Sequence, residues 1–179
     1  MTEAMIDLVL EGYLPPSADQ VARRAGVSMA SLFRYFETLD ELRQATIERY
    51  LDRFAHLFDI PDPGLGPLTE RIERFVAARI RLFESTEPIG RLARSRAATV
   101  PDFDHSLRQA RATTAAQVRQ HFATELSRLS PARRDDLVAV VSTTTSFESW
   151  LQLRDDYARS TPQTRRAWTN ALRCLLNDA

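Results

Sequence analysis

The stretch that decides the fold is Pro16-Ser-Ala-Asp-Gln-Val-Ala-Arg-Arg-Ala-Gly-Val-Ser-Met-Ala-Ser-Leu-Phe-Arg-Tyr-Phe36. It predicts two short helices separated by a tight turn. Ser17 and Gln20 have the spacing of a capping box, in which each side chain bonds a free backbone N–H of the other residue. Gly26 stands where a helix ends in the left-handed conformation, which glycine adopts without steric cost. Ser28 then caps the second helix.

The spacing of small and apolar residues in this stretch favours a helix-turn-helix. Two helices that cross steeply need a small residue at their contact, which is Ala22, and a turn glycine four residues later, which is Gly26. Leu32 supplies the apolar plug on the second helix. In a helix-turn-helix the second helix enters the major groove of DNA. A helical hairpin with no role in nucleic-acid binding is the alternative interpretation.

A second capping box, formed by Thr38 and Glu41, follows at once and begins a longer helix. The run Ala25-Gly-Val-Ser-x-x-x-Leu-Phe-Arg-Tyr-Phe36, with this capped helix, resembles the DNA-binding domain of the TetR family of transcriptional repressors. The resemblance covers about the first fifty residues. It implies an all-α fold, with an N-terminal three-helix helix-turn-helix domain and a C-terminal helical domain for ligand binding and dimerisation.

The resemblance places the DNA contacts on the second helix and at the starts of the neighbouring helices. Arg34 is the predicted base-reading residue, because a guanidinium forms bidentate hydrogen bonds to guanine. Tyr35 and Thr38 are expected to bind phosphates, although Tyr35 is alternatively a half-buried core aromatic. The complete predicted set is Ser17, Ser28, Met29, Ala30, Ser31, Phe33, Arg34, Tyr35 and Thr38.

The charge of the first part of the chain does not favour nucleic-acid binding. The whole chain has 24 basic and 24 acidic residues and no net charge. Residues 1–50 contain five arginines and eight acidic residues, a local net charge of −3, whereas DNA affinity depends largely on phosphate neutralisation. The family often has a basic residue at Met29, tyrosine at Phe33 and lysine at Leu39, so their absence predicts weak binding or an unusual operator. The first expected helix, 3–13, is short for this family, which suggests an upstream start or a lost basic arm.

A break in the chain separates two expected domains. Asp59-Ile-Pro-Asp-Pro-Gly-Leu-Gly-Pro67 contains three prolines and two glycines and cannot continue a helix. We expect a DNA-binding domain over 1–58, with its connecting helix over 39–58, and a regulatory and dimerisation domain over 59–179. In the second domain the sequence predicts helices over 68–85, from the turn at 100–106 to about 129, over 132–156, and from Thr161 onward. Glu87-Pro88 is expected to interrupt the first of these.

The last two expected helices are apolar around much of their circumference and must be covered on two sides. Because TetR-like proteins dimerise there, the predicted homodimer interface comprises Leu137, Val141, Trp150, Trp168, Leu172 and Leu176; core burial in a monomer is the alternative. The preceding helices could enclose a pocket for a small apolar effector, lined by Phe75, Arg79, Phe83, Phe103, Phe122, Thr143, Thr144 and Phe147, or could form a packed core.

The sequence indicates no enzyme, cofactor or metal chemistry. Gly64-Leu-Gly66 lacks the third glycine and the preceding strand of a phosphate-binding loop. Asp102, Asp104 and His105 lie before a helix, where aspartate is an ordinary cap, and they have no ligand-spaced partners.

No apolar run approaches the ~20 residues of a membrane span, and the single cysteine, Cys174, excludes an intramolecular disulfide, which favours the cytoplasm. The expected function is that of a homodimeric repressor that binds a palindromic double-stranded DNA operator and is released by a small apolar effector. A helical dimeric protein-interaction module with a degenerate DNA reader is the alternative.

Overall fold

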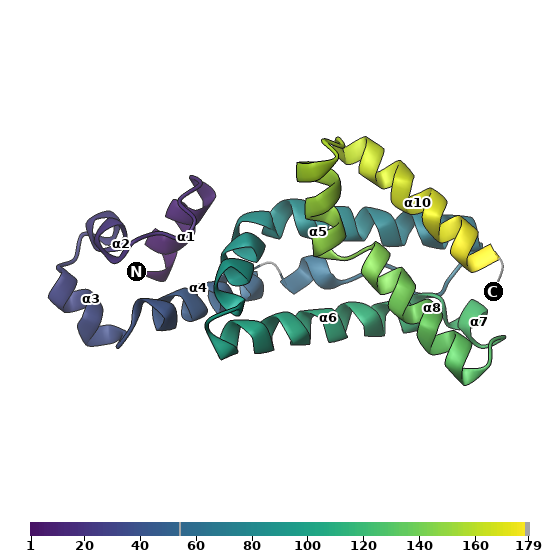
Figure 1. Ribbon diagram of the computed structural model, residues 1–179, viewed down its shortest axis with the longest axis horizontal. Coiled ribbons are helices and arrows are strands. Elements are labelled where there is room, and N and C mark those ends of the chain that lie inside the picture. Colours follow the sequence, from purple (N-terminus) through teal and green to yellow (C-terminus); the bar gives the residue numbers. More distant parts are fainter. Residues whose placement is uncertain (54, 178–179) are drawn as a thin grey trace. The chain divides into compact units, whose positions relative to one another are not determined.

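The computed structural model describes residues 1–53 and 55–177, and helices make up most of them (Figure 1). The helices are α1 (Thr2–Leu10), α2 (Ala18–Ala25), α3 (Met29–Tyr35), α4 (Leu39–Arg53), α5 (Leu68–Ala97), α6 (Pro101–His121), α7 (Ala123–Leu126), α8 (Pro131–Thr144), α9 (Phe147–Leu151) and α10 (Thr161–Asn177), with a 3-10 turn at Ala55–Phe58 and a π-helical turn at Gln152–Asp156. The described residues contain no strand, which confirms the all-α class. Two compact units are present, the first with residues 1–56 and 86–108, the second with 57–85 and 109–179.

The first unit contains the three short helices expected from the sequence, followed by α4. Met5 of α1, Leu32 of α3 and Leu42 of α4 are fully buried in one core. Leu92 and Phe103 are buried in the same core. Residues 86–108 therefore belong to this unit, although the sequence analysis assigned everything after residue 58 to the second domain.

The helix α5 continues through Pro88 instead of ending at Glu87-Pro88 as expected. A proline inside a helix removes one backbone hydrogen bond and strains the preceding turn. The residues that follow, Ile89 and Leu92, are 2% and 0% exposed in the core of the first unit. Burial of these side chains stabilises the helical continuation against the cost of the proline.

Four helices end earlier than the sequence predicts. The helix α1 ends at Leu10 instead of residue 13, and α4 ends at Arg53 instead of residue 58. The helix expected to run to about residue 129 ends at His121, and Phe122 leaves helical geometry before the single turn of α7. The helix expected over 132–156 ends at Thr144, because Ser146 caps a new helix by accepting a hydrogen bond from the Ser149 N–H at 3.0 Å. The chain therefore turns twice where the sequence suggests straight helices.

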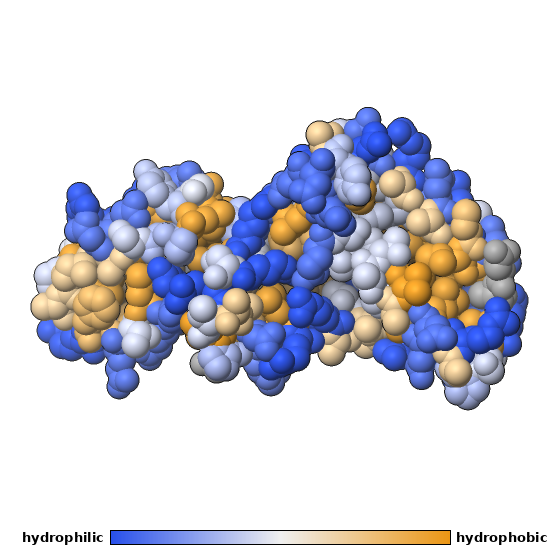
Figure 2. All heavy atoms as spheres, viewed as in Figure 1, coloured by the Kyte–Doolittle hydropathy of each residue, from blue (hydrophilic) through white to orange (hydrophobic). Residues whose placement is uncertain are grey.

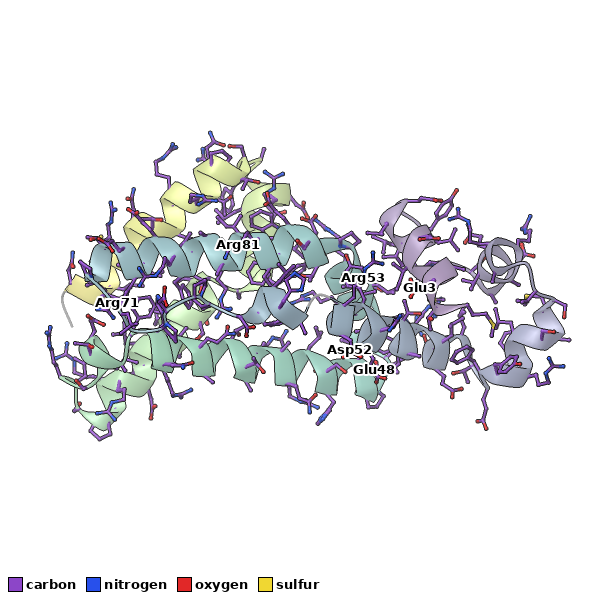
Figure 3. The ribbon with its side chains drawn as sticks, turned by 180° about the vertical axis from the view of Figure 1, so that it is seen from behind. Glu3, Glu48, Asp52, Arg53, Arg71 and Arg81 are labelled. Carbon is purple, nitrogen blue, oxygen red and sulfur yellow. The ribbon has the colours of Figure 1, made fainter. Side chains whose placement is uncertain are left out.

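A buried ion pair joins α5 to α7 within the second unit. Arg71 donates to both carboxylate oxygens of Glu125, at 2.8 and 2.5 Å, and to the carbonyls of Gly66 and His121. Both side chains are 5% exposed. Burial opposes ionisation of the carboxyl, but the hydrogen bonds from Arg71 outweigh it, so the pKa of Glu125 lies below its ordinary value. Figure 3 labels Arg71 on α5.

In the first unit, the carboxylate of Asp40 accepts hydrogen bonds from Arg96, at 2.6 and 3.0 Å, and from Arg43 at 2.7 Å. Burial opposes its ionisation, yet these bonds hold the pKa of Asp40 below its ordinary value. A lowered folded-state pKa contributes stability that is fully present above the ordinary pKa and is lost as the pH falls through the folded value. The hydrogen bonds of Asp40 with Arg43 and Arg96 therefore stabilise the first unit at neutral pH.

We expect Asp40→Asn to reduce the free energy of unfolding at pH 7 and to make it less dependent on pH below about pH 4, where ordinary aspartates titrate. Urea unfolding measured from pH 7 down to pH 2 tests this. Asp52→Asn, at an exposed position of α4, is the matched control. Equal pH dependence of the Asp40→Asn variant and the wild type would contradict the assigned role of Asp40.

Candidate nucleic-acid interface

The turn between α2 and α3 is built by two capped helix ends. The Ser17 N–H donates to Gln20 Oε1 at 2.8 Å, and the Gln20 N–H donates to Ser17 Oγ at 3.3 Å, so the expected capping box is present. Gly26 has φ +67° and ends α2 in the left-handed conformation. Ser28 then begins α3, its hydroxyl accepting from the Ser31 N–H at 3.1 Å. These caps fix the path of the chain into α3.

The short helix α3 is anchored by one side chain and exposes most of the others. Leu32 is fully buried, whereas Met29, Phe33 and Tyr35 are 40%, 44% and 66% exposed. Tyr35 is therefore not a half-buried core aromatic. Arg34 is also exposed, with its guanidinium carbon 5.5 Å from the centre of the Tyr35 ring. Figure 2 shows hydrophobic residues on the surface of the first unit where α3 lies. A helix that presents aromatic, apolar and cationic side chains outward has the composition of a recognition surface.

The remaining predicted contacts flank this surface. Ala30 is exposed, and Ser31 is half-buried with its hydroxyl 3.1 Å from that of Ser28. Thr38 accepts from the Glu41 N–H at 3.0 Å, and the Glu41 carboxylate accepts from the Glu37 N–H at 2.7 Å. The reciprocal bond thus reaches Glu37, one residue before the position expected from a capping box. The hydroxyl hydrogen of Thr38 stays available for a phosphate oxygen.

The neighbouring arginines are held by carboxylates. Arg23 pairs with Asp19 one turn away, and Arg24 donates to both oxygens of Glu11 at 2.6 and 2.8 Å. Arg43 pairs with Asp40, and Arg49 pairs with Glu3. Among the described residues, Arg34 is the one arginine of positions 1–50 with no hydrogen bond or ion pair to the protein.

The acidic surroundings have a direct electrostatic consequence. The hydrogen bond to Glu11 is the main cause of a raised pKa at Arg24, and the reciprocal bond lowers the pKa of Glu11. Paired guanidinium groups attract anions less than free ones, so the unpaired arginine charge of positions 1–50 is that of Arg34. The Asp19–Arg23 pair could have been predicted from its i, i+4 spacing. The Glu11–Arg24 pair joins positions 13 apart and had no sequence signal.

The structure does not bring the predicted pocket residues together around one cavity. Phe103 lies in the core of the first unit, whereas the other phenylalanines of the set lie in the core of the second. There they pack in pairs, Phe83 with Phe147 at 5.4 Å between ring centres and Phe75 with Phe122 at 5.2 Å. The threonines are peripheral: Thr143 is exposed, and Thr144 is half-buried.

Arg79, the remaining residue of the set, is 2% exposed. Its guanidinium carbon lies 4.7 Å from the centre of the Phe75 ring, and its two Nη atoms donate to Gln117 Oε1 at 2.5 Å and to the Thr114 carbonyl at 2.9 Å. Burial lowers its pKa to about 10. One pocket of the second unit is lined by Gln117 and by residues of the segment Phe58–Pro63.

Most of the residues predicted for the dimer interface are covered within the same chain. Val141, Trp150, Trp168, Leu172 and Leu176 are each 2% exposed or less, and Leu137 is half-buried. Trp150 and Trp168 contact each other at 6.2 Å between ring centres, and the indole N–H of Trp168 lies 3.3 Å from Ser149 Oγ. A side chain without exposed surface cannot contact a partner subunit, so these residues form the core of the second unit. Val140 of α8, which the predicted interface did not include, is 46% exposed.

No group of three metal-ligating side chains lies together among the described residues, and the side chain of Asp102 is outside them. No helix among the described residues is long and apolar enough to cross a membrane.

Known proteins resemble this chain in sequence over part of its length and in fold over almost all of it. No family model matches the sequence. A stretch of 59 residues is 41% identical to uncharacterized HTH-type transcriptional regulators of Mycobacterium bovis and Mycobacterium tuberculosis, covering 32% of this chain and 30% of each relative. The match thus spans less than a third of the length of these relatives.

Solved structures match over almost the whole chain. A tetR-family transcriptional regulator from Streptomyces coelicolor has a TM-score of 0.73 and 21% identity over 97% of this chain and 77% of its own. A transcriptional regulator from Rhodococcus sp. Rha1 has a TM-score of 0.72 and 19% identity over 99% and 95%. The multidrug binding protein EbrR, complexed with imidazole, has a TM-score of 0.64 and 18% identity over 98% and 92%.

Proposed function

We propose that this chain, which has the all-helical fold of TetR-family regulators, is a DNA-binding transcriptional regulator that represses its target as a homodimer on a palindromic operator. A small apolar effector releases it, and it acts in the cytoplasm, where a bacterial chromosome is accessible. The sequence match to HTH-type regulators supports DNA binding rather than catalysis. The likeness in fold to a multidrug binding protein supports a small-molecule effector.

The observation that carries the proposal is that the side chain of Arg34 is exposed and forms no ion pair with another described residue. It is exposed on the second helix of a helix-turn-helix, next to the exposed Tyr35, and has no ion pair among the described residues. A free guanidinium on a recognition helix can form two hydrogen bonds to the O6 and N7 acceptors of guanine. Met29 and Phe33 on the same helix offer apolar contact to thymine methyl groups.

The two-fold symmetry of the proposed dimer determines how it would recognise an operator and how an effector would release it. One recognition helix reads only a few base pairs, and a two-fold dimer extends the site to a palindrome with half-sites about one helical turn apart. An effector releases DNA only if it binds the non-binding arrangement of the dimer more tightly, since equal affinity for both arrangements shifts nothing.

Selection from a library of random DNA duplexes tests the DNA-binding proposal. The purified protein is expected to enrich a palindrome, and its affinity should fall steeply as the salt concentration rises, because bound phosphates release counterions. The slope of the logarithm of affinity against the logarithm of salt concentration gives the number of phosphate contacts. We expect this number to be small, because most arginines of the first unit are paired with carboxylates. Absence of any enriched sequence at low salt would contradict the proposal.

A helical protein-interaction module is the second candidate function. It is favoured by the carboxylates that hold Arg23, Arg24, Arg43 and Arg49, which leave little positive charge for a phosphate backbone. The same selection separates the two functions, because such a module retains its dimer and enriches no DNA sequence.

We expect Val140→Glu to convert the dimer to monomers without unfolding the chain. Val140 is a large exposed apolar residue of α8, and a carboxylate placed there would have to be desolvated in a subunit interface formed by α8 and α10. Sedimentation velocity measures the change, and circular dichroism confirms retained helicity. Leu65→Glu, at a 64% exposed apolar position before α5, is the matched control and should stay dimeric. A Val140→Glu variant that stays dimeric would exclude this face.

A further inference from the structure

A pocket of about 290 Å³ opens in the second unit where α10 lies beside the first half of α5 (Figure 1). Two contacts hold α10 along α5. Arg173 pairs with Glu73 at 2.9 Å, and the hydroxyl of Thr161 donates to the carboxylate of Glu84 at 2.7 Å. Glu73 lines the pocket from α5, and the rest of its described lining comes from α10, between Pro162 and Arg173. One side of α10, positioned by α5, therefore forms most of its wall.

Guanidinium groups dominate this wall. Arg166 and Arg173 are seven residues apart, which is about two helical turns, and Arg165 lies next to them in the lining. Glu73 supplies the single carboxylate of the described lining. The helix adds no compensating acid, because residues 161–177 contain no aspartate or glutamate. The pocket is therefore lined by three positive charges and one negative charge.

Two of the three guanidinium groups are unpaired among the residues that the structure describes. Arg165 and Arg166 are exposed and form no hydrogen bond or ion pair there. Arg173 gives one N–H to Glu73 and keeps a side chain that is 42% exposed, so others of its five N–H donors are free. Like charges that converge on a concave surface create a local positive potential, which an anion neutralises.

This pocket lies on a different side of α10 from the apolar stripe that is available to a partner subunit. Ala167, Ala171 and Leu175 recur every four residues and form that stripe, and none of them lines the pocket. Ala167 is exposed, and the other two are half-buried. At about 100° per residue, Ala171 lies about 160° from Arg173 around the helix. A dimer formed through this stripe leaves the pocket open.

From this arrangement we infer that the pocket binds a dianionic phosphate group, free or as a small monoester, with Arg165, Arg166 and Arg173 donating to its terminal oxygens. Such a group carries up to two negative charges and presents three strong acceptor oxygens, which match the net charge and the three guanidinium groups of the lining. Arginine binds phosphate through two parallel N–H donors. The amide of Asn170 offers a further donor. A lone carboxylate has one charge and two oxygens and satisfies fewer of these donors.

Isothermal titration calorimetry on the purified full chain without DNA tests this binding independently of the proposed regulatory function. Methyl phosphate and dimethyl phosphate are compared at pH 8 and constant ionic strength. We expect methyl phosphate to bind at least about tenfold more tightly, because it has twice the charge and one more terminal oxygen. Dimethyl phosphate also represents the phosphodiester backbone of a nucleic acid. Equal affinity for the two esters, or no binding of methyl phosphate at millimolar concentrations, would overturn the inference.

Orthophosphate distinguishes the two sources of the group. An affinity equal to that of methyl phosphate supports a site for free phosphate, whereas tighter binding of methyl phosphate supports a site for a monoester whose organic part contacts Pro162.

Two variants should change the affinity in opposite directions. Arg166→Gln should weaken methyl phosphate binding about tenfold, the value of one charge-assisted hydrogen bond. Glu73→Gln should tighten it about threefold, because it removes a like charge and releases Arg173. Arg133→Gln, which removes an exposed arginine of α8 outside the lining, is the matched control and should leave binding unchanged.

All three substituted side chains are exposed, so each variant should keep the melting temperature of the wild type. A merely structural role for the Arg173–Glu73 pair would give no gain in affinity on Glu73→Gln. If Arg166→Gln binds methyl phosphate as tightly as Arg133→Gln does, or if Glu73→Gln weakens binding, the pocket is not a phosphate site.

Discussion

Replacing Arg34 with alanine is expected to lower affinity for the selected operator by about 1–3 kcal/mol per half-site, the discrimination that a bidentate contact to guanine provides. Because a dimer loses the contact twice, specific binding should become hard to detect beside non-specific binding. Fluorescence anisotropy with the selected operator and with a scrambled duplex measures both affinities. The substitution should leave folding unchanged, since Arg34 makes no hydrogen bond to the protein among the described residues.

Two further variants define what Arg34 contributes. Arg34→Lys keeps the charge but not the planar pair of donors, so it should retain affinity for the scrambled duplex while losing preference for the operator. Arg49→Ala removes an exposed arginine of the same unit that pairs with Glu3, and it is the matched control. If Arg34→Ala binds the operator as tightly as Arg49→Ala does, the base contact must come from another residue.

The largest loss of stability is expected from Arg71→Met. Removing one partner leaves the carboxylate of Glu125 buried at 5% exposure without a counter-ion, which costs about 3–5 kcal/mol. The two backbone carbonyls that Arg71 caps also lose their donor. Urea unfolding followed by circular dichroism measures the change. Because the pKa of Glu125 lies below its ordinary value, the wild type should lose the same contribution on acidification, and the variant should lose less.

The double variant Arg71→Met/Glu125→Leu separates the attraction of the pair from the penalty of an orphaned charge. An apolar pair of similar volume often restores stability, so the double variant should be more stable than Arg71→Met alone. Arg108→Met, which breaks an exposed pair with Asp104, should change stability by about 0.5 kcal/mol or less. A loss at Arg71 no larger than at Arg108 would show that the buried pair is not a major stabilising contact.

The part of the fold that could be predicted from sequence is the part that local chemistry determines. Ser17 and Gln20, Gly26 and Ser28 each act within four residues of the group they bond, and all of them lie where the sequence placed them. Leu32 is the buried plug and Tyr35 is exposed. The starts of α2 and α3 could therefore be predicted from capping rules alone.

Tertiary contacts determined the features that the sequence did not predict. Pro88 was read as a helix end, but burial of Ile89 and Leu92 keeps α5 continuous. The abundance of apolar residues around Trp150 and Trp168 was read as an interface, although the two indoles cover each other within one chain. Hydrophobic periodicity shows that a side chain is buried, and it does not show whether the covering residue belongs to the same subunit.

The first unit is built from two separate parts of the sequence, which limits how this chain can be recombined with others of the same fold. Its core includes Leu92 and Phe103 from the segment 86–108, which begins 19 residues after the linker at 59–67. A fragment cut at residue 58 would leave the surfaces that cover these side chains bare and open to aggregation. A chimera that exchanges the whole first unit must therefore carry two separate pieces, 1–56 and 86–108, and the crossovers that bound the second piece fall inside α5 and α6.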